Sequence, residues 1–280
     1  MTKWNLIVDV AECTNCNMCT LATHDEYVGN DWPGYSAAMP KHGHHWIDIQ
    51  RNERGTGPMV DVAFLPVMCQ HCDDAPCMKA AKDGAVKKRD DGIVLIDPVK
   101  SKGQKQIVDS CPYGAIYWND EKQIPQHWTF DAHLLDQGWK EPRAAQACPT
   151  AAITALKTDD TAMAAKAHAE GLEPLHPEYG TRPRVWYKNL YRFAECFVGG
   201  SLATEKNGVI DCVSGAAITL RHNDKVLGEA VSDGFGDFKI DRVKPNSGPC
   251  RVTIAAPGHA AITIDCEVKG ESVYLGTITV

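Results

Sequence analysis

The spacing of eight cysteines constrains this chain more than any other feature of its sequence. Six of them form two loops of three closely spaced thiols, and two more each stand directly before a proline. These cysteines are Cys13, Cys16 and Cys19; Cys69, Cys72 and Cys77; Cys111; and Cys148. Free cysteines that serve as small buried apolar residues do not recur at fixed offsets. The pattern therefore indicates ligands of an inorganic centre.

The arrangement of the thiols favours iron and sulfide over zinc. Three close cysteines plus a distant cysteine before proline is how bacterial ferredoxins hold [4Fe–4S] clusters, with the distant cysteine serving the cluster of another motif. Structural zinc more often takes two close cysteine pairs. A disulfide framework is not expected either, because the chain begins without an apolar export signal and reducing compartments keep thiols free.

Four ferredoxin-like motifs can be traced, and eight of their ligand positions hold other residues. We pair the first motif with the last and the second with the third, so that each pair exchanges its distant ligands. The retained cysteines then form two complete sets: Cys13, Cys16, Cys19 and Cys148, and Cys69, Cys72, Cys77 and Cys111. The replaced positions form two empty sets: Thr23, Trp128, Asp131 and Ala144, and Ala81, Ser101, Gln104 and Ile107. A half-ligated cluster is unstable, so cysteine ligands are expected to be lost as complete sets. The two complete sets that are retained therefore predict two [4Fe–4S] clusters.

These motifs and several longer segments resemble the iron–sulfur subunits of molybdopterin enzymes of the dimethyl sulfoxide reductase family. The segments are DGIVLIDP (91–98), AHLLD (132–136) and RPRVWYKNLYRF (182–193). Within that family, NDWPGYSA (30–37) and the His-rich stretch at 42–58 are most similar to two groups of small subunits. These groups are the pyrogallol–phloroglucinol transhydroxylases and the resorcinol hydroxylases. The resemblance covers essentially the whole chain.

The resemblance implies a non-catalytic, electron-transfer subunit. Its partner would be a large catalytic subunit that carries molybdenum as bis-molybdopterin guanine dinucleotide and acts on phenolic rings. A third cluster, as in the transhydroxylases, is not implied, since this chain also lacks ligands at Thr23, Trp128, Asp131 and Ala144. One alternative is a structural or assembly subunit whose clusters only stabilise the fold of the chain. Another is an electron-transfer subunit of a molybdopterin oxidoreductase that acts on sulfur, arsenic or nitrogen oxyanions.

The predicted fold class is α+β, with two ferredoxin-like halves followed by an all-β sandwich. Residues 1–157 form the double iron–sulfur domain, with the second half inserted at about 60–120. Residues 158–199 form a helix, starting at Thr158 or an Asp and stopped by Gly171, and an extended, proline-containing connector. Residues 200–280 alternate short strands with Gly, Asn and Asp turns, which indicates about seven strands. This part resembles transthyretin-like or carboxypeptidase-regulatory-like modules.

Other conspicuous residues are assigned structural roles. Four cysteines lack ligand spacing and are predicted to be structural: Cys196, Cys212, Cys250 and Cys266. His42, His44 and His45 are predicted to lie at a surface or interface rather than to bind metal. His71 either donates a hydrogen bond to a cluster sulfur or is a plain loop residue. DGFGDF (233–238) is predicted to be a hairpin turn, and no catalytic constellation stands out.

Charge and hydropathy exclude two further classes. A formal charge of −7 argues against nucleic-acid binding, which requires basic surface. No run of about 18 apolar residues is present, so no membrane span is expected. The cytoplasm is the predicted location, and the alternative is export together with a partner that bears a twin-arginine signal.

Overall fold

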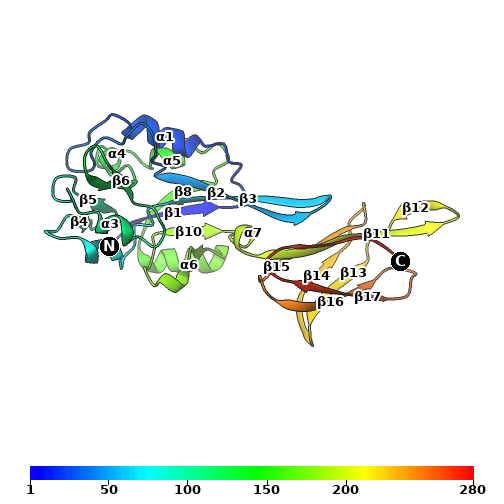
Figure 1. Ribbon diagram of the computed structural model, residues 1–280. Coiled ribbons are helices and arrows are strands. Elements are labelled where there is room, and N and C mark those ends of the chain that lie inside the picture. Colours follow the sequence, from blue (N-terminus) through cyan, green and yellow to red (C-terminus); the bar gives the residue numbers. More distant parts are fainter. The chain divides into compact units, whose positions relative to one another are not determined.

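The computed structural model describes residues 1–280 and divides into two compact units (Figure 1). The first unit contains residues 1–50 and 64–190, and the second contains residues 51–63 and 191–280. Each unit has buried hydrophobic clusters of its own. None of the helices has the length and apolar character needed to cross a bilayer.

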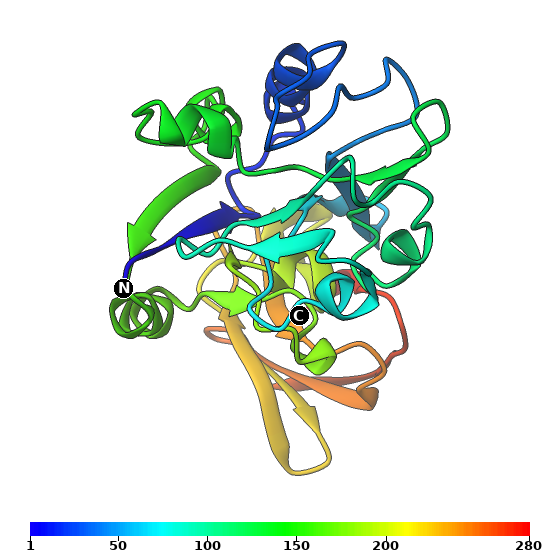
Figure 2. The same cartoon turned by 90° about the vertical axis from the view of Figure 1, so that its left-hand side faces the viewer.

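A four-stranded sheet forms the centre of the first unit. Its order is β8 (Ile153–Thr158), β1 (Lys3–Asp9), β10 (Val185–Lys188) and β9 (Glu173–Pro174). β8 runs antiparallel and β10 parallel to β1, and Figure 2 shows β1 and β8 side by side. The five central residues of β1 are all buried, as expected for a strand covered on both faces.

The predicted helix after β8 is confirmed. It is α6 (Asp160–Glu170), and the side chain of Asp159 caps its start by accepting a backbone N–H bond of 2.9 Å. Gly171 ends the helix in the left-handed conformation, with φ of 63°. Met163 and Ala167, four residues apart on one face, are buried against the central sheet.

Short hairpins and helices complete the first unit. They are α1 (Met18–Tyr27), α2 (Pro76–Ala80), β4 (Val86–Lys88), β5 (Val94–Ile96), α3 (Gln106–Asp109), β6 (Tyr117–Asn119), β7 (Ile124–Gln126), α4 (Ala132–Asp136), α5 (Arg143–Gln146) and the 3₁₀ helix η1 (Pro177–Tyr179). β4 pairs with β5 and β6 pairs with β7. The hairpin of β2 (Ile47–Thr56) and β3 (Met59–Met68) begins and ends in the first unit, while residues 51–63 belong to the second.

The observed division differs from the predicted connector at 158–199. Residues 158–190 belong to the first unit, because β10 joins the central sheet with Leu6 opposite Val185. A four-residue strand that pairs in parallel with the far N-terminus leaves no local sequence signal, whereas the surrounding prolines do.

Two four-stranded sheets make up most of the second unit. In one sheet β11 pairs with β12 and β15 in antiparallel and with β18 in parallel; the other sheet has the order β14-β13-β16-β17. The elements are α7 (Tyr191–Ala194), β11 (Cys196–Lys206), β12 (Val209–Cys212), β13 (Ala217–His222), β14 (Lys225–Val231), β15 (Asp237–Val243), β16 (Gly248–Ala255), β17 (Ile262–Val268) and β18 (Val273–Thr279). The predicted β-rich C-terminal region is confirmed.

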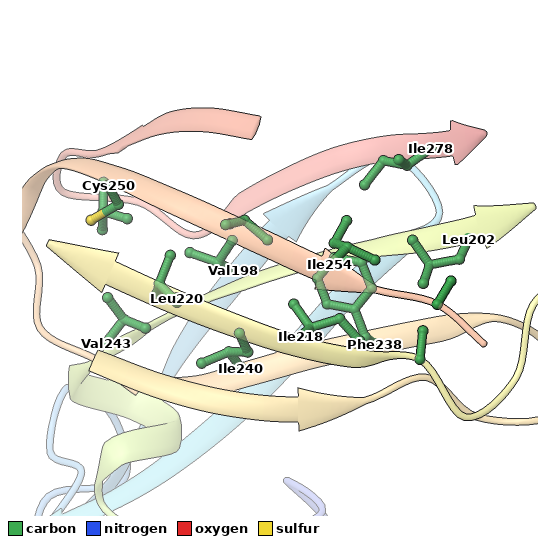
Figure 3. Close-up of a cluster of buried hydrophobic side chains, with 14 of the residues drawn as sticks. Val198, Leu202, Ile218, Leu220, Phe238, Ile240, Val243, Cys250, Ile254 and Ile278 are labelled. Carbon is green, nitrogen blue, oxygen red and sulfur yellow. The ribbon is translucent and has the colours of Figure 1, made fainter. Parts of the chain in front are cut away.

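The core of the second unit lies between the two sheets (Figure 3). Leu202 and Phe238 from one sheet and Leu220 and Ile254 from the other belong to a single buried cluster. Inward residues alternate with outward ones along β15 and β16, which is the pattern of a sheet with one buried face. Of the four cysteines without ligand spacing, Cys196 and Cys250 lie in this core, Cys266 packs against it and Cys212 is exposed.

The DGFG segment is a tight turn, but it is not the predicted hairpin. The N–H of Asp233 donates to the carbonyl of Asp237 at 2.9 Å. However, the flanking strands β14 and β15 belong to different sheets, so the turn links the two layers. Gly236 has φ of +81°, and a Cβ there would lie 2.3 Å from the Leu202 carbonyl oxygen, whereas a Cβ at Gly234 would meet nothing within 4 Å.

These two glycines allow a matched test of the turn. We expect Gly236→Ala to lower the free energy of unfolding by at least about 2 kcal/mol, because it combines a left-handed backbone with a backbone clash. Gly234→Ala is expected to change it by less than about 0.5 kcal/mol. Urea denaturation followed by circular dichroism measures both, and equal effects of the two substitutions would contradict the described turn.

Candidate iron–sulfur sites

The four traced motifs share one backbone feature. In each, the residue before the second ligand position has a left-handed conformation, with φ of 57° at Asn15, 45° at His71, 77° at Gly103 and 59° at Phe130. Alternation of right- and left-handed residues turns successive N–H groups toward one point, a concavity that binds anions such as iron–sulfur centres. Two of these loops carry cysteines and two do not, so the replaced motifs keep the left-handed residue found in the cysteine loops.

A second turn recurs where the motifs place their distant ligand. Gly114 and Ala151, three residues after Cys111 and Cys148, have φ of 64° and 54°, and Gly84 in the corresponding segment has φ of 63°. The N–H of Gly114 donates to the Cys111 carbonyl at 3.2 Å, and that of Ala151 to the Cys148 carbonyl at 3.2 Å. The internal repeat seen in the sequence is thus present in the backbone.

The first predicted cysteine set comes together in the first unit. α1, which contains Cys19, lies beside α5, which ends shortly before Cys148 (Figure 1). Two ion pairs of 2.6 Å hold the helices together, from Arg143 to Asp25 and to Glu26. Beyond the larger effect of burial, the charge of Cys148 raises the pKa of both Cys13 and Cys19. Sulfurs far apart in sequence therefore interact electrostatically.

The second predicted set also comes together. Cys77 and Cys111 pack against the same buried hydrophobic cluster. Burial, together with the charges of Cys111 and Cys72, raises the pKa of Cys77 to about 12. Burial raises the pKa of Cys69 well above its ordinary value, and Cys77, Cys111 and Cys72 raise it further. In each predicted set, the distant cysteine thus interacts electrostatically with cysteines of its own three-cysteine loop.

The thiols gather without converging on one point. No group of three or more His, Cys, Asp or Glu side chains is arranged to chelate a single metal ion. Four thiolates on one tetrahedral zinc would lie about 3.8 Å apart, because Zn–S bonds measure about 2.3 Å. In a cubane each thiolate binds a different iron, so the sulfurs stand further apart. The two kinds of centre therefore require different spacings of the four sulfurs.

Burial keeps the thiols of Cys19 and Cys72 protonated in the free protein. The pKa of Cys19 and that of Cys72 are each raised to about 11, chiefly by burial. Because only the thiolate binds metal, iron must displace these protons when a cluster is inserted. The same burial that disfavours free thiolates shields a bound cluster from water.

Charged residues fix the loop that carries Cys69 and Cys72. The ammonium of Lys88 donates to the carbonyls of His71 and Cys72 at 2.9 and 3.0 Å, and pairs with Asp73 at 2.9 Å. The side chain of Arg184, itself buried, also pairs with Asp73. Sequence analysis missed these residues, because their partners lie up to 111 positions away and no short motif marks them.

The histidines have defined structural roles. A hydrogen bond from the backbone N–H of His71 opposes the rise of the Cys69 pKa. Its ring Nδ1 accepts the N–H of Val94 at 3.1 Å. His44, predicted to lie at a surface or interface, is instead 5% exposed. Its Nε2 donates to the Trp118 carbonyl at 3.0 Å, because the β6 hairpin covers this loop.

One empty set is filled by an amide, two apolar side chains and the buried hydroxyl of Ser101, which has no hydrogen-bond partner. The side chain of Gln104 accepts the N–H of Lys82 at 2.8 Å and donates to the Lys100 carbonyl at 2.8 Å. Lys82 and Lys100 are the chain neighbours of Ala81 and Ser101, two other members of this set. Ile107 is fully buried in the neighbouring hydrophobic cluster. The positions expected for a cluster are occupied by well-packed side chains.

The other empty set is filled around a buried carboxylate. Asp131 is 1% exposed and accepts hydrogen bonds from the Tyr27 hydroxyl (2.7 Å), the Trp128 indole N–H (3.2 Å) and the Arg143 backbone N–H (2.8 Å). Thr23 donates to the Cys19 carbonyl at 2.9 Å. All four members of this set are at most 2% exposed: Thr23, Trp128, Asp131 and Ala144. These residues do not fit a cluster.

Comparison with known proteins identifies the family to which the chain belongs. Residues 60–157 match the family described as a 4Fe-4S dicluster domain. The small subunit of pyrogallol hydroxytransferase from Pelobacter acidigallici is 44% identical over 99% of both chains. The chain belongs to the iron–sulfur subunits of molybdopterin oxidoreductases.

Other members of this family match a smaller part of the chain. The iron–sulfur subunit of arsenate respiratory reductase from Shewanella sp. is 27% identical over 66% of this chain and 95% of its own length. A tetrathionate reductase subunit from Salmonella typhimurium is 30% identical over 67% of this chain and 73% of its own length.

The Asp131 network makes a prediction about stability. Asp131→Ala removes the acceptor of three buried donors and should lower the free energy of unfolding by about 3 kcal/mol. Asp120→Ala, at an exposed position, serves as control and should change it by less than about 0.5 kcal/mol. Both follow from urea denaturation of the full chain, and a similar small change for both variants would exclude this role of Asp131.

Proposed function

We propose that the chain holds two [4Fe–4S] clusters and transfers electrons for a large molybdopterin catalytic subunit. The main support is the gathering of two complete cysteine sets, each from one three-cysteine loop and one distant Cys-Pro segment. The first set comprises Cys13, Cys16, Cys19 and Cys148, and the second comprises Cys69, Cys72, Cys77 and Cys111. A bound cluster of this type accepts and gives one electron at a time.

The surroundings of the two sites should give the clusters different potentials. Lys88 lies beside the second site, and its positive charge favours the reduced, more negative state of a cluster there. The backbone N–H of His71 acts in the same direction by donating to the Cys69 sulfur. In the first site Cys16 is exposed, whereas Cys69 and Cys72 in the second are buried. Charge, hydrogen bonds and exposure are the means by which a protein adjusts cluster potentials.

We further propose that the catalytic partner carries bis-molybdopterin guanine dinucleotide and acts on a phenolic ring. The match over the full length to a pyrogallol hydroxytransferase small subunit supports this choice. The relatives named for arsenate and tetrathionate reductases match about two thirds of the chain. The two sheets of the second unit are consistent with a transthyretin-like or carboxypeptidase-regulatory-like module, which we also retain as a proposal.

Iron analysis tests the number of clusters. Anaerobically purified chain should contain about eight iron and eight sulfide. Cys111→Ala should reduce both to about four, because it removes one ligand of the second cluster. Cys212→Ala, which changes an exposed cysteine outside both sets, should leave them unchanged. About twelve iron per chain, or zinc in place of iron, would refute the two-cluster proposal.

Co-purification and spectroscopy test the electron-transfer role. The affinity-tagged chain should co-purify with a molybdenum-containing subunit. If the complex is a hydroxylase, a phenolic substrate should reduce at least one cluster at the rate of turnover, as seen by freeze-quench EPR. Clusters that remain oxidised while substrate is hydroxylated would instead favour the alternative in which they only stabilise the fold.

A further inference from the structure

We infer that the two clusters of the proposed function are electronically separated, because packed side chains fill the space between their sites. The inference rests on the proposed function and concerns one set of residues in the first unit. This set, named here the intervening group, consists of Thr23, Tyr27, Trp128, Phe130 and Asp131.

The intervening group adjoins the first site through α1 and α5. Thr23 stands one helical turn after Cys19 and donates to the Cys19 carbonyl at 2.9 Å. Tyr27, one turn further, donates to Asp131 at 2.7 Å. Asp131 also accepts the backbone N–H of Arg143 on α5, five residues before Cys148. Both segments that supply the first cysteine set therefore contact this group.

The same group adjoins the second site through its aromatic rings. The ring centroids of Trp128 and Phe130 lie 5.9 and 5.4 Å from that of His71. His71 stands between Cys69 and Cys72, and its N–H donates to the Cys69 sulfur. Trp128 and Phe130 are also stacked on one another, with centroids 5.0 Å apart. The intervening group thus contacts the loops of both sites.

The intervening group leaves no room for a third centre. Its five side chains are at most 2% exposed, and Asp131 uses both carboxylate oxygens in hydrogen bonds. Phe130 keeps the left-handed backbone conformation found in the cysteine loops, which is strained for a bulky residue. Its contacts with Trp128, His71 and Trp4 hold it there. The loop has the form of a cluster site, and aromatic rings fill it.

The consequence concerns the route of electrons. Tunnelling through protein weakens steeply with distance, so two clusters with no redox centre at the position between them exchange electrons slowly. The cluster nearer the catalytic partner then takes part in turnover, and the other remains isolated from it. One chain then combines both roles considered for the clusters: one cluster transfers electrons, and the other only stabilises the fold.

EPR of the full chain tests the separation directly. Two variants with a single cluster each serve as references: Cys148→Ala, which lacks the first, and Cys111→Ala, which lacks the second. All three proteins are reduced anaerobically with a low-potential europium(II) chelate. The spectrum of the unmodified chain should equal the sum of the two single-cluster spectra, without splitting or broadening from spin coupling.

Two outcomes separate this inference from the function on which it rests. Split or broadened signals in a chain with about eight iron would overturn the separation and leave the two-cluster function intact. A chain without iron and sulfide would overturn both. If either variant does not fold, the unmodified chain decides alone, because uncoupled spins give unsplit signals and coupled spins do not.

Discussion

The antiparallel pairing of β1 with β8 is the contact on which the first cysteine set depends. It extends from Lys3 opposite Thr158 to Val8 opposite Ile153, and continues as the N–H of Asp9 donates to the Ala152 carbonyl at 2.7 Å. Cys13 follows one of these strands and Cys148 precedes the other, so the pairing brings together thiols separated by most of the first unit. Without it, the three-cysteine loop would not lie near Cys148, its proposed fourth ligand.

Burial gives the two sites a common energetic character. Burial holds several of these thiols at a raised pKa, against the opposing effect of nearby hydrogen bonds, so the protein without iron retains neutral thiols rather than a group of repelling anions. Insertion of iron removes the protons and neutralises part of the charge. Charges are balanced locally around the second site, where Lys88 and Arg184 share Asp73. The conformation of the cysteine loop in the second site is thus coupled to these ion pairs.

The sequence was sufficient for features defined by local spacing and insufficient for those defined by distant pairing. The expected start at a Thr or Asp and the stop at Gly171 placed α6 correctly, while the two cysteine sets inferred from the intervals stay a prediction. The membership of β10 in the central sheet and the burial of His44 were missed, since both depend on segments far away in the chain. The DGFG turn was recognised, yet which strands it joins depends on how the two sheets stack.

The left-handed residue in all four loops has a consequence for how such a protein can change. Because Phe130 and Gly103 retain the main-chain shape seen at Asn15 and His71, a metal centre can disappear from this architecture by side-chain exchange alone. The peptide framework then stays constant, and its filling varies between sulfur ligands, an amide and aromatic rings. Clusters can accordingly be gained or lost one at a time without a change in the fold of the domain.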